Sequence, residues 1–192
     1  DALVISESIY GNYEKALELC KRRYSRDTNN FDFGLLAGTY SALGQYKESL
    51  KYYKKIEKYS SDPKSNSNLM RQIGYAYWQN GYKTEAEQWF NKQKKKDEES
   101  LKLGRSSSIF TNINLAALYA FKGEREKAYE QLNAFNKIQI CMFHFIRFMK
   151  SEPMFNSIRN EPEFQKIVGE LEAKYQDEHE RVRKWLEENG KL

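Results

Sequence analysis

The sequence predicts an all-α protein built from repeated pairs of antiparallel helices. Two observations support this prediction. An ordered pattern of small and bulky residues recurs along the chain, and residues that interrupt helices are few, with three Pro and ten Gly among 192 residues. Hydrophobic residues make up 40% of the chain and charged residues 31%, which is typical of a water-soluble domain with its own core. No apolar run approaches the length of a bilayer-spanning helix, so we expect no membrane span.

The clearest copy of the pattern lies in residues 73–90, IGYAYWQNGYKTEAEQWF. Its apolar spacing predicts two short helices, and Gly81 provides a tight turn between them. Gly74 and Ala86 are small where the two helices must approach each other closely, and Phe90 closes the second helix. The stretch therefore predicts one helix–turn–helix unit.

The same order of residues recurs along the chain, with intervals of 33, 37 and 42 residues between successive turn glycines. Each turn glycine is followed five positions later by a small residue: Gly11 by Ala16, Gly44 by Ser49, Gly81 by Ala86, and Gly123 by Ala128. Four positions further on stand Cys20, Tyr53, Phe90 and Leu132. In the last three copies the first helix carries an aliphatic residue, a small residue and a tyrosine on one face: Leu36, Ala37 and Tyr40; Ile73, Gly74 and Tyr77; Leu115, Ala116 and Tyr119. One helix pair cannot bury its apolar face alone, so we expect the pairs to stack.

This order, aliphatic-small-x-x-Tyr-x-x-x-Gly-x-x-x-x-Ala-x-x-x-aromatic, resembles the tetratricopeptide repeat, whose period is about 34 residues. The resemblance covers residues 1–136, and the first copy either lacks most of its first helix or is cut within it. It implies a right-handed α-solenoid of about four repeats, at about 1–29, 30–66, 67–108 and 109–136. Residues 137–192 are expected to add a degenerate helical unit and a long C-terminal capping helix.

Two segments between the repeats are longer than the pattern requires. Residues 60–68, SSDPKSNSN, predict a loop. Residues 91–103 continue the helical spacing, so we expect the second helix of the third repeat to extend by one to two turns and to end at Gly104. Ser106–Ser108 then provide an N-cap for the next helix. A lysine cluster within the extension is interpreted as a solvated face balanced by acids, in preference to a patch for an acidic partner: Lys92, Lys94, Lys95 and Lys96, with Asp97, Glu98 and Glu99.

The pattern changes after the fourth repeat. Residues 138–150, IQICMFHFIRFMK, predict one strongly apolar helix. Two Glu-Pro steps follow in residues 152–164, where each Pro suits the first position of a helix. The apolar residues of this segment are expected to point inward: Phe155, Ile158 and Phe164. The segment resembles the terminal element that follows tetratricopeptide arrays in some bacterial regulators and cyclase-like signalling proteins.

The last helix is expected to run from about Pro162 to Asn189 and to end at Gly190. Its apolar residues lie on one face, and its first half should cap the array. The second half carries a smaller apolar set, which either pairs with a second chain or folds back on its own array: Val182, Trp185 and Leu186.

The remaining residue types point away from catalysis and cofactor binding. Cys20 and Cys141 are interpreted as small buried hydrophobes, because neither has the spacing of a disulfide framework or a metal site. His144 lies in an apolar run and is interpreted as structural, while His179 lacks the second His of a zinc-binding helix. We therefore expect no catalytic residues, no cofactor and no metal.

The net charge of +5 and the pI near 9.0 indicate weak attraction to acidic partners. Basic and acidic residues are interleaved throughout, so nucleic-acid binding is not expected. The chain starts at Asp1 without a signal-like segment, which suits either an excised domain or a mature secreted form. The compartment stays open, with the cytoplasm favoured.

In the tetratricopeptide family the first helices of the repeats line a concave groove that accepts a peptide or an extended segment. The resemblance places seven residues of this chain in such a groove: Arg71, Tyr75, Trp78, Gln79, Phe110, Asn114 and Phe121. The first four are expected on the side of their helix opposite the packing residues. The family's carboxylate clamp is absent, and the groove is expected either to be open or to be filled by the final helix or a neighbouring chain.

These observations predict a non-enzymatic scaffold for protein–protein interaction, part of a larger bacterial regulator or assembly. The partner is a protein or a peptide. The alternative is a self-associating module that forms a homodimer through the C-terminal helix. A nucleic-acid-associated regulator is a distant third.

Overall fold

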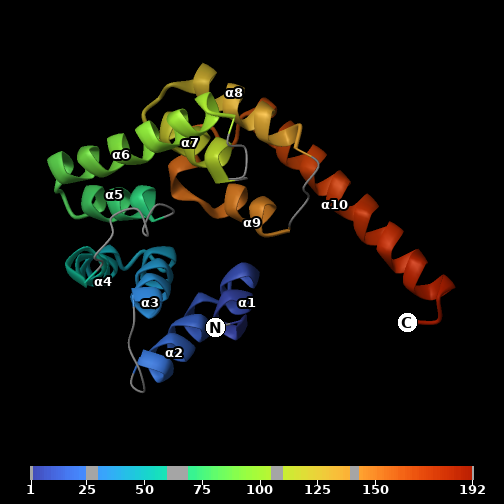
Figure 1. The fold of residues 1–192 in the computed structure, drawn as a ribbon, viewed down its shortest axis with the longest axis horizontal. Helices are drawn as coiled ribbons and strands as arrows, with labels where there is room; N and C mark the ends of the chain where they lie inside the picture. The colour runs from blue at the N-terminus through green and yellow to red at the C-terminus, as the bar shows by residue number, and fades with distance from the viewer. Residues whose placement is uncertain (1, 25–29, 60–68, 105–109, 139–142, 192) are drawn as a thin grey trace. The chain divides into compact units, whose positions relative to one another are not determined.

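The computed structural model describes residues 2–24, 30–59, 69–104, 110–138 and 143–191 (Figure 1). Within these ranges the regular secondary structure is helical and contains no β-strand, which confirms the predicted all-α fold class. Helix contacts divide the chain into an N-terminal unit, Asp1–Glu99, and a C-terminal unit, Ser100–Leu192. No helix in the described ranges has the length and apolar character needed to cross a membrane.

The N-terminal unit consists of helices that pack in chain order, α1 on α2, α2 on α3, α3 on α4 and α4 on α5. Their bounds are α1 Ala2–Tyr10, α2 Tyr13–Tyr24, α3 Asn30–Ala42, α4 Tyr46–Tyr59, α5 Met70–Gln79 and α6 Lys83–Lys102, of which the last three residues belong to the C-terminal unit. The first helix has nine residues, fewer than the 13 of α3.

The residues of the repeated pattern form the cores of the helix pairs, as predicted. The small residues of the second helices are 0% exposed: Ala16, Ser49, Ala86 and Ala128. The aliphatic residues of the first helices are at most 1% exposed: Leu36, Ile73 and Leu115. The tyrosines are each 7% exposed: Tyr40, Tyr77 and Tyr119. Ser49 adds a polar contact, because its hydroxyl donates to the carbonyl of Ala37 on the paired helix at 2.8 Å.

Each helix pair turns at a glycine in the left-handed region, with φ of 83° at Gly11, 71° at Gly44, 85° at Gly81 and 76° at Gly123. At the third turn the N–H of Tyr82 donates to the carbonyl of Tyr77 at 3.1 Å, the six-to-one bond of a Schellman motif. Tyr77, the tyrosine of the repeated pattern, therefore contributes its ring to the core and its carbonyl to the turn.

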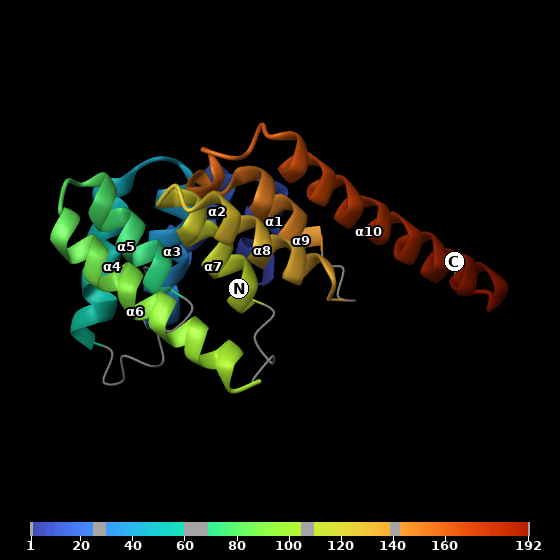
Figure 2. The same cartoon turned by 90° about the horizontal axis from the view of Figure 1, so that it is seen from above.

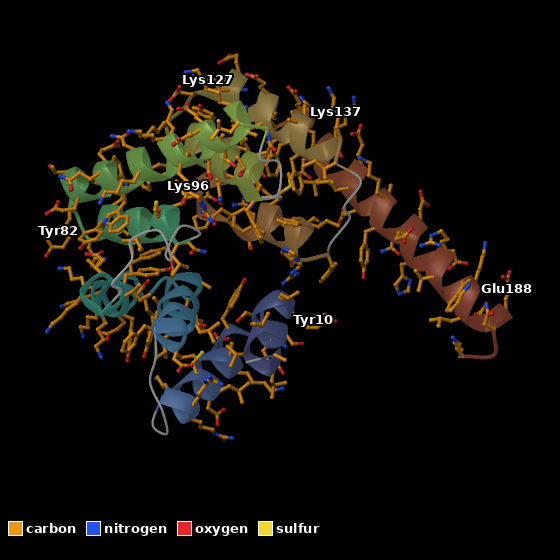
Figure 3. The ribbon with its side chains drawn as sticks, in the orientation of Figure 1. Tyr10, Tyr82, Lys96, Lys127, Lys137 and Glu188 are labelled. Carbon is orange, nitrogen blue, oxygen red and sulfur yellow. The ribbon has the colours of Figure 1, made fainter. Side chains whose placement is uncertain are left out.

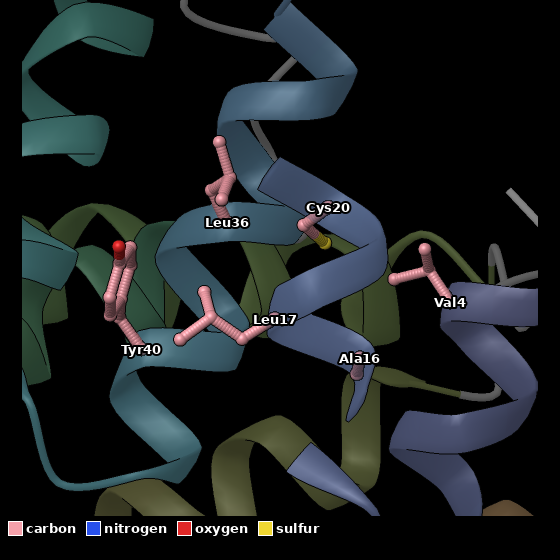
Figure 4. Close-up of a cluster of buried hydrophobic side chains, with 6 residues drawn as sticks. All are labelled: Val4, Ala16, Leu17, Cys20, Leu36 and Tyr40. Carbon is pink, nitrogen blue, oxygen red and sulfur yellow. The ribbon is translucent and has the colours of Figure 1, made fainter. Parts of the chain in front are cut away.

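The helices α1, α2 and α3 share a compact apolar cluster (Figure 4). Its buried members are Val4, Ala16, Leu17, Cys20, Leu36 and Tyr40. Cys20 is 3% exposed with a free thiol, and burial raises the pKa of that thiol. The interpretation of Cys20 as a small buried hydrophobe is confirmed, whereas Cys141 lies outside the described residues.

The predicted extension of the third repeat's second helix is also confirmed. Helix α6 has 20 residues, against 14 in α4 and 12 in α8, and Gly104 follows it with φ of 61°. The expected loop at 60–68 and the expected cap at Ser106–Ser108 lie outside the described residues.

The C-terminal unit pairs α7, Phe110–Phe121, with α8, Arg125–Asn136. It continues with α9, Phe143–Ser151, the short 3₁₀ helix η1, Pro153–Phe155, and α10, Pro162–Glu188. Helix α10 packs on α8 and α9, and η1 packs on α7.

One predicted boundary in this unit is wrong. The apolar stretch from Ile138 was expected to be a single helix, but Ile138 itself is not helical, and the described part of the helix is α9, Phe143–Ser151. Residues 139–142 lie outside the described residues. Ile138 instead belongs to the turn that closes α8, because its N–H donates to the carbonyl of Phe135 at 3.0 Å. An apolar run does not show where one helix ends and the next begins.

The Glu-Pro segment behaves as predicted. Phe155, Ile158 and Phe164 are all 0% exposed. Pro153 and Pro162 begin η1 and α10, and the side chain of Glu152 accepts from the N–H of Met154 at 3.3 Å.

Side-chain contacts connect the second Glu-Pro step to the α7–α8 pair. The carboxylate of Glu161 accepts from the hydroxyl of Tyr129 at 2.6 Å and pairs with Arg125 at 2.7 Å. The hydroxyl of Ser157 donates to the carbonyl of Ala120 at 2.8 Å. These bonds hold the start of α10 against α7 and α8.

Helix α10 changes character along its length. Its buried residues all lie in the first half: Phe164, Ile167, Val168 and Leu171. Tyr175 still meets the ring of Phe143, with ring centroids 5.5 Å apart. Beyond it α10 runs on past α8 and α9, where Val182 is 41% exposed and Trp185 49% exposed (Figure 2). Within this unit the second half of α10 does not fold back.

Candidate partner-binding surface

Helix α5 carries four of the seven predicted partner-binding residues, and its packing on α6 decides how they lie. An added Cβ at Gly74 would be 2.6 Å from two ring atoms of Phe90 and 3.2 Å from the carbonyl oxygen of Ala86. The absence of a side chain at Gly74 therefore sets the close approach of α5 and α6, as predicted.

The predicted orientation of Trp78 is wrong. It was expected on the side of α5 opposite Phe90, but the two ring centroids lie 6.4 Å apart. The Nζ of Lys83 on α6 lies 3.6 Å from the centroid of the Trp78 ring and donates to the Trp78 carbonyl at 3.0 Å. Trp78 is half-buried beside α6, because α5 approaches closely enough at Gly74 for a large ring to reach across.

Tyr75 and Gln79 lie in different environments on the same helix. Tyr75 is 8% exposed and meets Tyr46 of α4 edge to face, with centroids 5.6 Å apart. Gln79 is exposed at the last position of α5. Of the four α5 residues, Gln79 presents the most surface to a partner.

Arg71 belongs to a buried polar cluster that sequence reasoning missed. It is 3% exposed, and its charge acts on Asp97, which is 1% exposed. The amide of Gln93, which is 0% exposed, donates to the Asp97 carboxylate at 2.7 Å. Asp97 was expected on a solvated face, so this interpretation is corrected.

A signal for this cluster was present in the sequence. The buried residues of α6 are Ala86, Phe90, Gln93 and Asp97, at steps of four, three and four. This is the spacing of one helix face. Ala86 and Phe90, which belong to the repeated pattern, therefore define a buried face of α6 that continues into Gln93 and Asp97.

Burial raises the pKa of Asp97 to about 6, although the hydrogen bond from Gln93 and the charges of Lys96 and Arg71 lower it. The carboxyl is thus less acidic than in water because desolvation disfavours its charged form. Its environment is that of a structural polar contact within the N-terminal unit.

The other three predicted residues lie on α7 in the C-terminal unit. Phe110 is 39% exposed, with its ring centroid 5.2 Å from Phe145 and 6.2 Å from His144. Asn114 is 5% exposed and Phe121 is half-buried. Phe110 is the most accessible of the three.

The groups with potential for catalysis or metal binding are dispersed. His144 is half-buried among aromatic rings, and burial lowers its pKa. His179 is exposed, with its ring 6.1 Å from Tyr175. Among the described residues no three His, Cys, Asp or Glu side chains are grouped to hold a metal ion.

Antiparallel helix pairs that repeat along the chain and turn at a left-handed glycine define a helical repeat protein. Within that class, the family model of the tetratricopeptide repeat matches residues 33–63 and 72–98. The chain therefore contains tetratricopeptide repeats, as its residue pattern predicted. The two matches correspond to the α3–α4 and α5–α6 pairs. No curated protein and no solved structure matches the chain significantly.

Proposed function

We propose that this chain is a non-enzymatic scaffold that binds a peptide or protein segment on the first-helix faces of its repeats. The observation that carries the proposal is the pair of tetratricopeptide repeats, because such repeats generally mediate protein–protein interaction and are typically non-catalytic. The pairs α1–α2 and α7–α8 are proposed as further, degenerate repeats, supported by their turn glycines and buried alanines. The Glu-Pro segment supports a place in a larger bacterial regulator or assembly.

The seven predicted residues divide into two roles under this proposal. The accessible side chains contact the partner, namely Gln79 on α5 and Phe110 at the start of α7, and the half-buried Trp78 and Phe121 contribute their exposed parts. The buried side chains hold the helices that present this surface: Arg71, Tyr75 and Asn114.

Site-specific photocrosslinking in cells tests the proposal and captures the partner in the same step. Benzoylphenylalanine replaces Gln79 or Phe110 on first helices, or the exposed Glu130 on the second helix α8, in cells that produce the protein. We expect the same partner to crosslink from Gln79 and Phe110 and not from Glu130. Equal crosslinking from all three positions contradicts a first-helix binding surface.

Titration of the purified chain with the captured partner then measures how much each residue contributes to binding affinity. Gln79→Ala and Phe110→Ala should each weaken binding by about 1 kcal/mol or more, with unchanged helicity by circular dichroism. Arg71→Ala is unsuitable as a binding variant, because it would remove a cation that acts on the buried Asp97. Unchanged affinity in both variants would remove these residues from the site.

Self-association through α10 is proposed as a second function. Trp185 and Val182 are 49% and 41% exposed on a helix whose buried residues end at Leu171. Exposed aromatic and aliphatic side chains grouped on one helix face are typical of interaction surfaces.

A further inference from the structure

Helix α4 carries the whole charge excess of the N-terminal unit. Residues 1–99 contain 17 Lys and Arg against 14 Asp and Glu, an excess of three. Helix α4 alone contains five Lys against two Glu, also an excess of three. The rest of the unit has equal numbers of basic and acidic residues, and α4 has the largest positive excess of its helices.

Four of these lysines share one face of α4. They follow each other at steps of three, one and three: Lys51, Lys54, Lys55 and Lys58. The Nζ of Lys54 lies 5.7 Å from the centroid of Tyr77 and 5.3 Å from that of Tyr82. These cation–π contacts hold the ammonium group near the surface before any partner arrives, which reduces the entropy lost on binding.

Lys55 is held by aromatic rings in the same way. Its Nζ lies 5.3 Å from the centroid of Phe33 and 5.0 Å from that of Tyr52. The two lysines at the centre of this face are therefore cations supported on aromatic rings.

The two acids of α4 balance only part of the charge of this face, because with Lys92 of α6 there are five lysines against Glu48 and Glu57. Glu48 is engaged by Lys51 at 2.6 Å. Glu57 is half-buried and accepts from the hydroxyl of Tyr77 at 3.1 Å, and burial raises its pKa. The charges of Lys54 and Lys92 act on this carboxylate and lower its pKa, so Glu57 lies near both cations.

Helix α6 contributes a cation to the same place. Lys92 is exposed, and its charge, like that of Lys54, acts on Glu57. Its Nζ lies 4.4 Å from the centroid of the Trp89 ring. Tyr82, 47% exposed just before α6, lies at the surface (Figure 3).

We propose that the lysine face of α4, with Lys92 of α6 and Tyr82 beside it, binds an acidic segment of a partner protein. Aspartate and glutamate side chains match the row of ammonium groups, and the exposed ring of Tyr82 accepts an apolar side chain of that segment. The surface lies on α4 and α6, so it is separate from the proposed first-helix site and does not depend on it. The cations are all Lys, and the modest charge of the unit favours an acidic peptide over the uniform charge of a nucleic acid.

Fluorescence anisotropy on the purified full chain tests this inference. The probe is a fluorescein-labelled peptide of about twelve residues, half of them Asp or Glu, with a Phe near each end, and the comparison probe is a single-stranded DNA of the same length. The test variant is Lys54→Glu with Lys92→Glu. The matched control is Lys137→Glu with Lys166→Glu, which makes the same charge change at exposed lysines of the C-terminal unit.

We expect the peptide to bind the wild-type chain. Its affinity should be about tenfold or more lower for the test variant and unchanged for the control variant. Affinity should also fall as NaCl rises from about 50 to 300 mM. Lys54→Gln with Lys92→Gln provides a gentler variant if the charge reversal alters the melting temperature.

Three results would overturn the inference. The first is an absence of peptide binding to the wild-type chain at low salt. The second is an equal loss of affinity in test and control variants, which would indicate attraction to net charge alone. The third is DNA binding that is tighter than peptide binding and is lost in the test variant, which would assign the face to nucleic acid.

Discussion

A missing side chain at Gly74 sets the distance between two helices. Alanine has the higher helix propensity, by about 1 kcal/mol, but its Cβ would lie 2.6 Å from the ring of Phe90, which is 1% exposed. The buried ring would have to shift to make room for this Cβ, so we expect overpacking to outweigh propensity. At this residue the tertiary contact dominates the local preference.

Gly74→Ala should therefore destabilise the protein by about 1–3 kcal/mol, measured by urea unfolding followed by circular dichroism. Gly38→Ala in α3 provides the matched control, because nothing lies within 4 Å of an added Cβ there. The control should be neutral or more stable by up to about 1 kcal/mol. Equal effects at the two glycines would contradict the close approach at Gly74.

Asp97 shows the opposite case, in which a polar residue is buried against its preference. Its carboxyl has a pKa of about 6 in the folded state and about 4 in an unfolded chain. The folded protein therefore binds the proton more tightly, and its stability falls as pH rises from about 4 to about 6.

Asp97→Asn should remove this dependence. The free energy of unfolding of the wild type, relative to the variant, should fall by about 2 kcal/mol between about pH 4 and pH 7.5. Urea titrations of both proteins at matched pH give this difference, in which all other groups cancel. A difference that stays constant with pH would show that Asp97 titrates normally.

At the scale of the element, Arg159 closes the end of α9. Its guanidinium donates to four acceptors around the start of the Glu-Pro segment: the carbonyls of Met149 at 2.9 Å, Lys150, and Glu152 at 2.5 Å, and the side chain of Asn156 at 2.8 Å. Carbonyl groups at a helix end have no partners within the helix. The flat, forked guanidinium satisfies several of them at once.

Arg159→Ala should destabilise the C-terminal unit by about 2–4 kcal/mol, because it leaves several carbonyls without a donor. Hydrogen exchange should rise in residues 143–164 and stay unchanged in α3 and α4. Arg159→Lys should give an intermediate effect, because one ammonium group cannot reach all four acceptors. Wild-type exchange in both variants would exclude this role.

At the scale of the whole molecule, the second half of α10 is the surface through which we propose that two chains associate. If two chains pair through this half, Trp185 becomes buried in the interface. Light scattering on the purified chain should then show a dimer that Trp185→Ala converts to a monomer. Tyr82→Ala, at a ring of similar exposure, should leave the dimer intact. A wild-type monomer at about 100 μM would reject self-association at ordinary affinities.

How far the candidate site was predictable differs between residues. The places of Ile73, Gly74, Ala86 and Phe90 in the core follow from periodicity, which reports a residue's face on its own helix. The orientation of Trp78 does not, because its contact with Phe90 depends on how closely α6 approaches. The burial of Gln93 and Asp97 was hidden by their polarity, although they continue the stripe of Ala86 and Phe90.

The sequence by itself determined the helix pairs, their turn glycines, the extension of α6 and the tetratricopeptide repeats, because each depends on local spacing and backbone preference. Only the tertiary structure decided that Arg71 and Tyr75 are buried, that Trp78 lies against α6, and that two lysines of α4 rest on aromatic rings. Burial and side-chain contact depend on the neighbouring helix. The apolar period of a helix shows which residues share a face, but it does not give the distance to that neighbour.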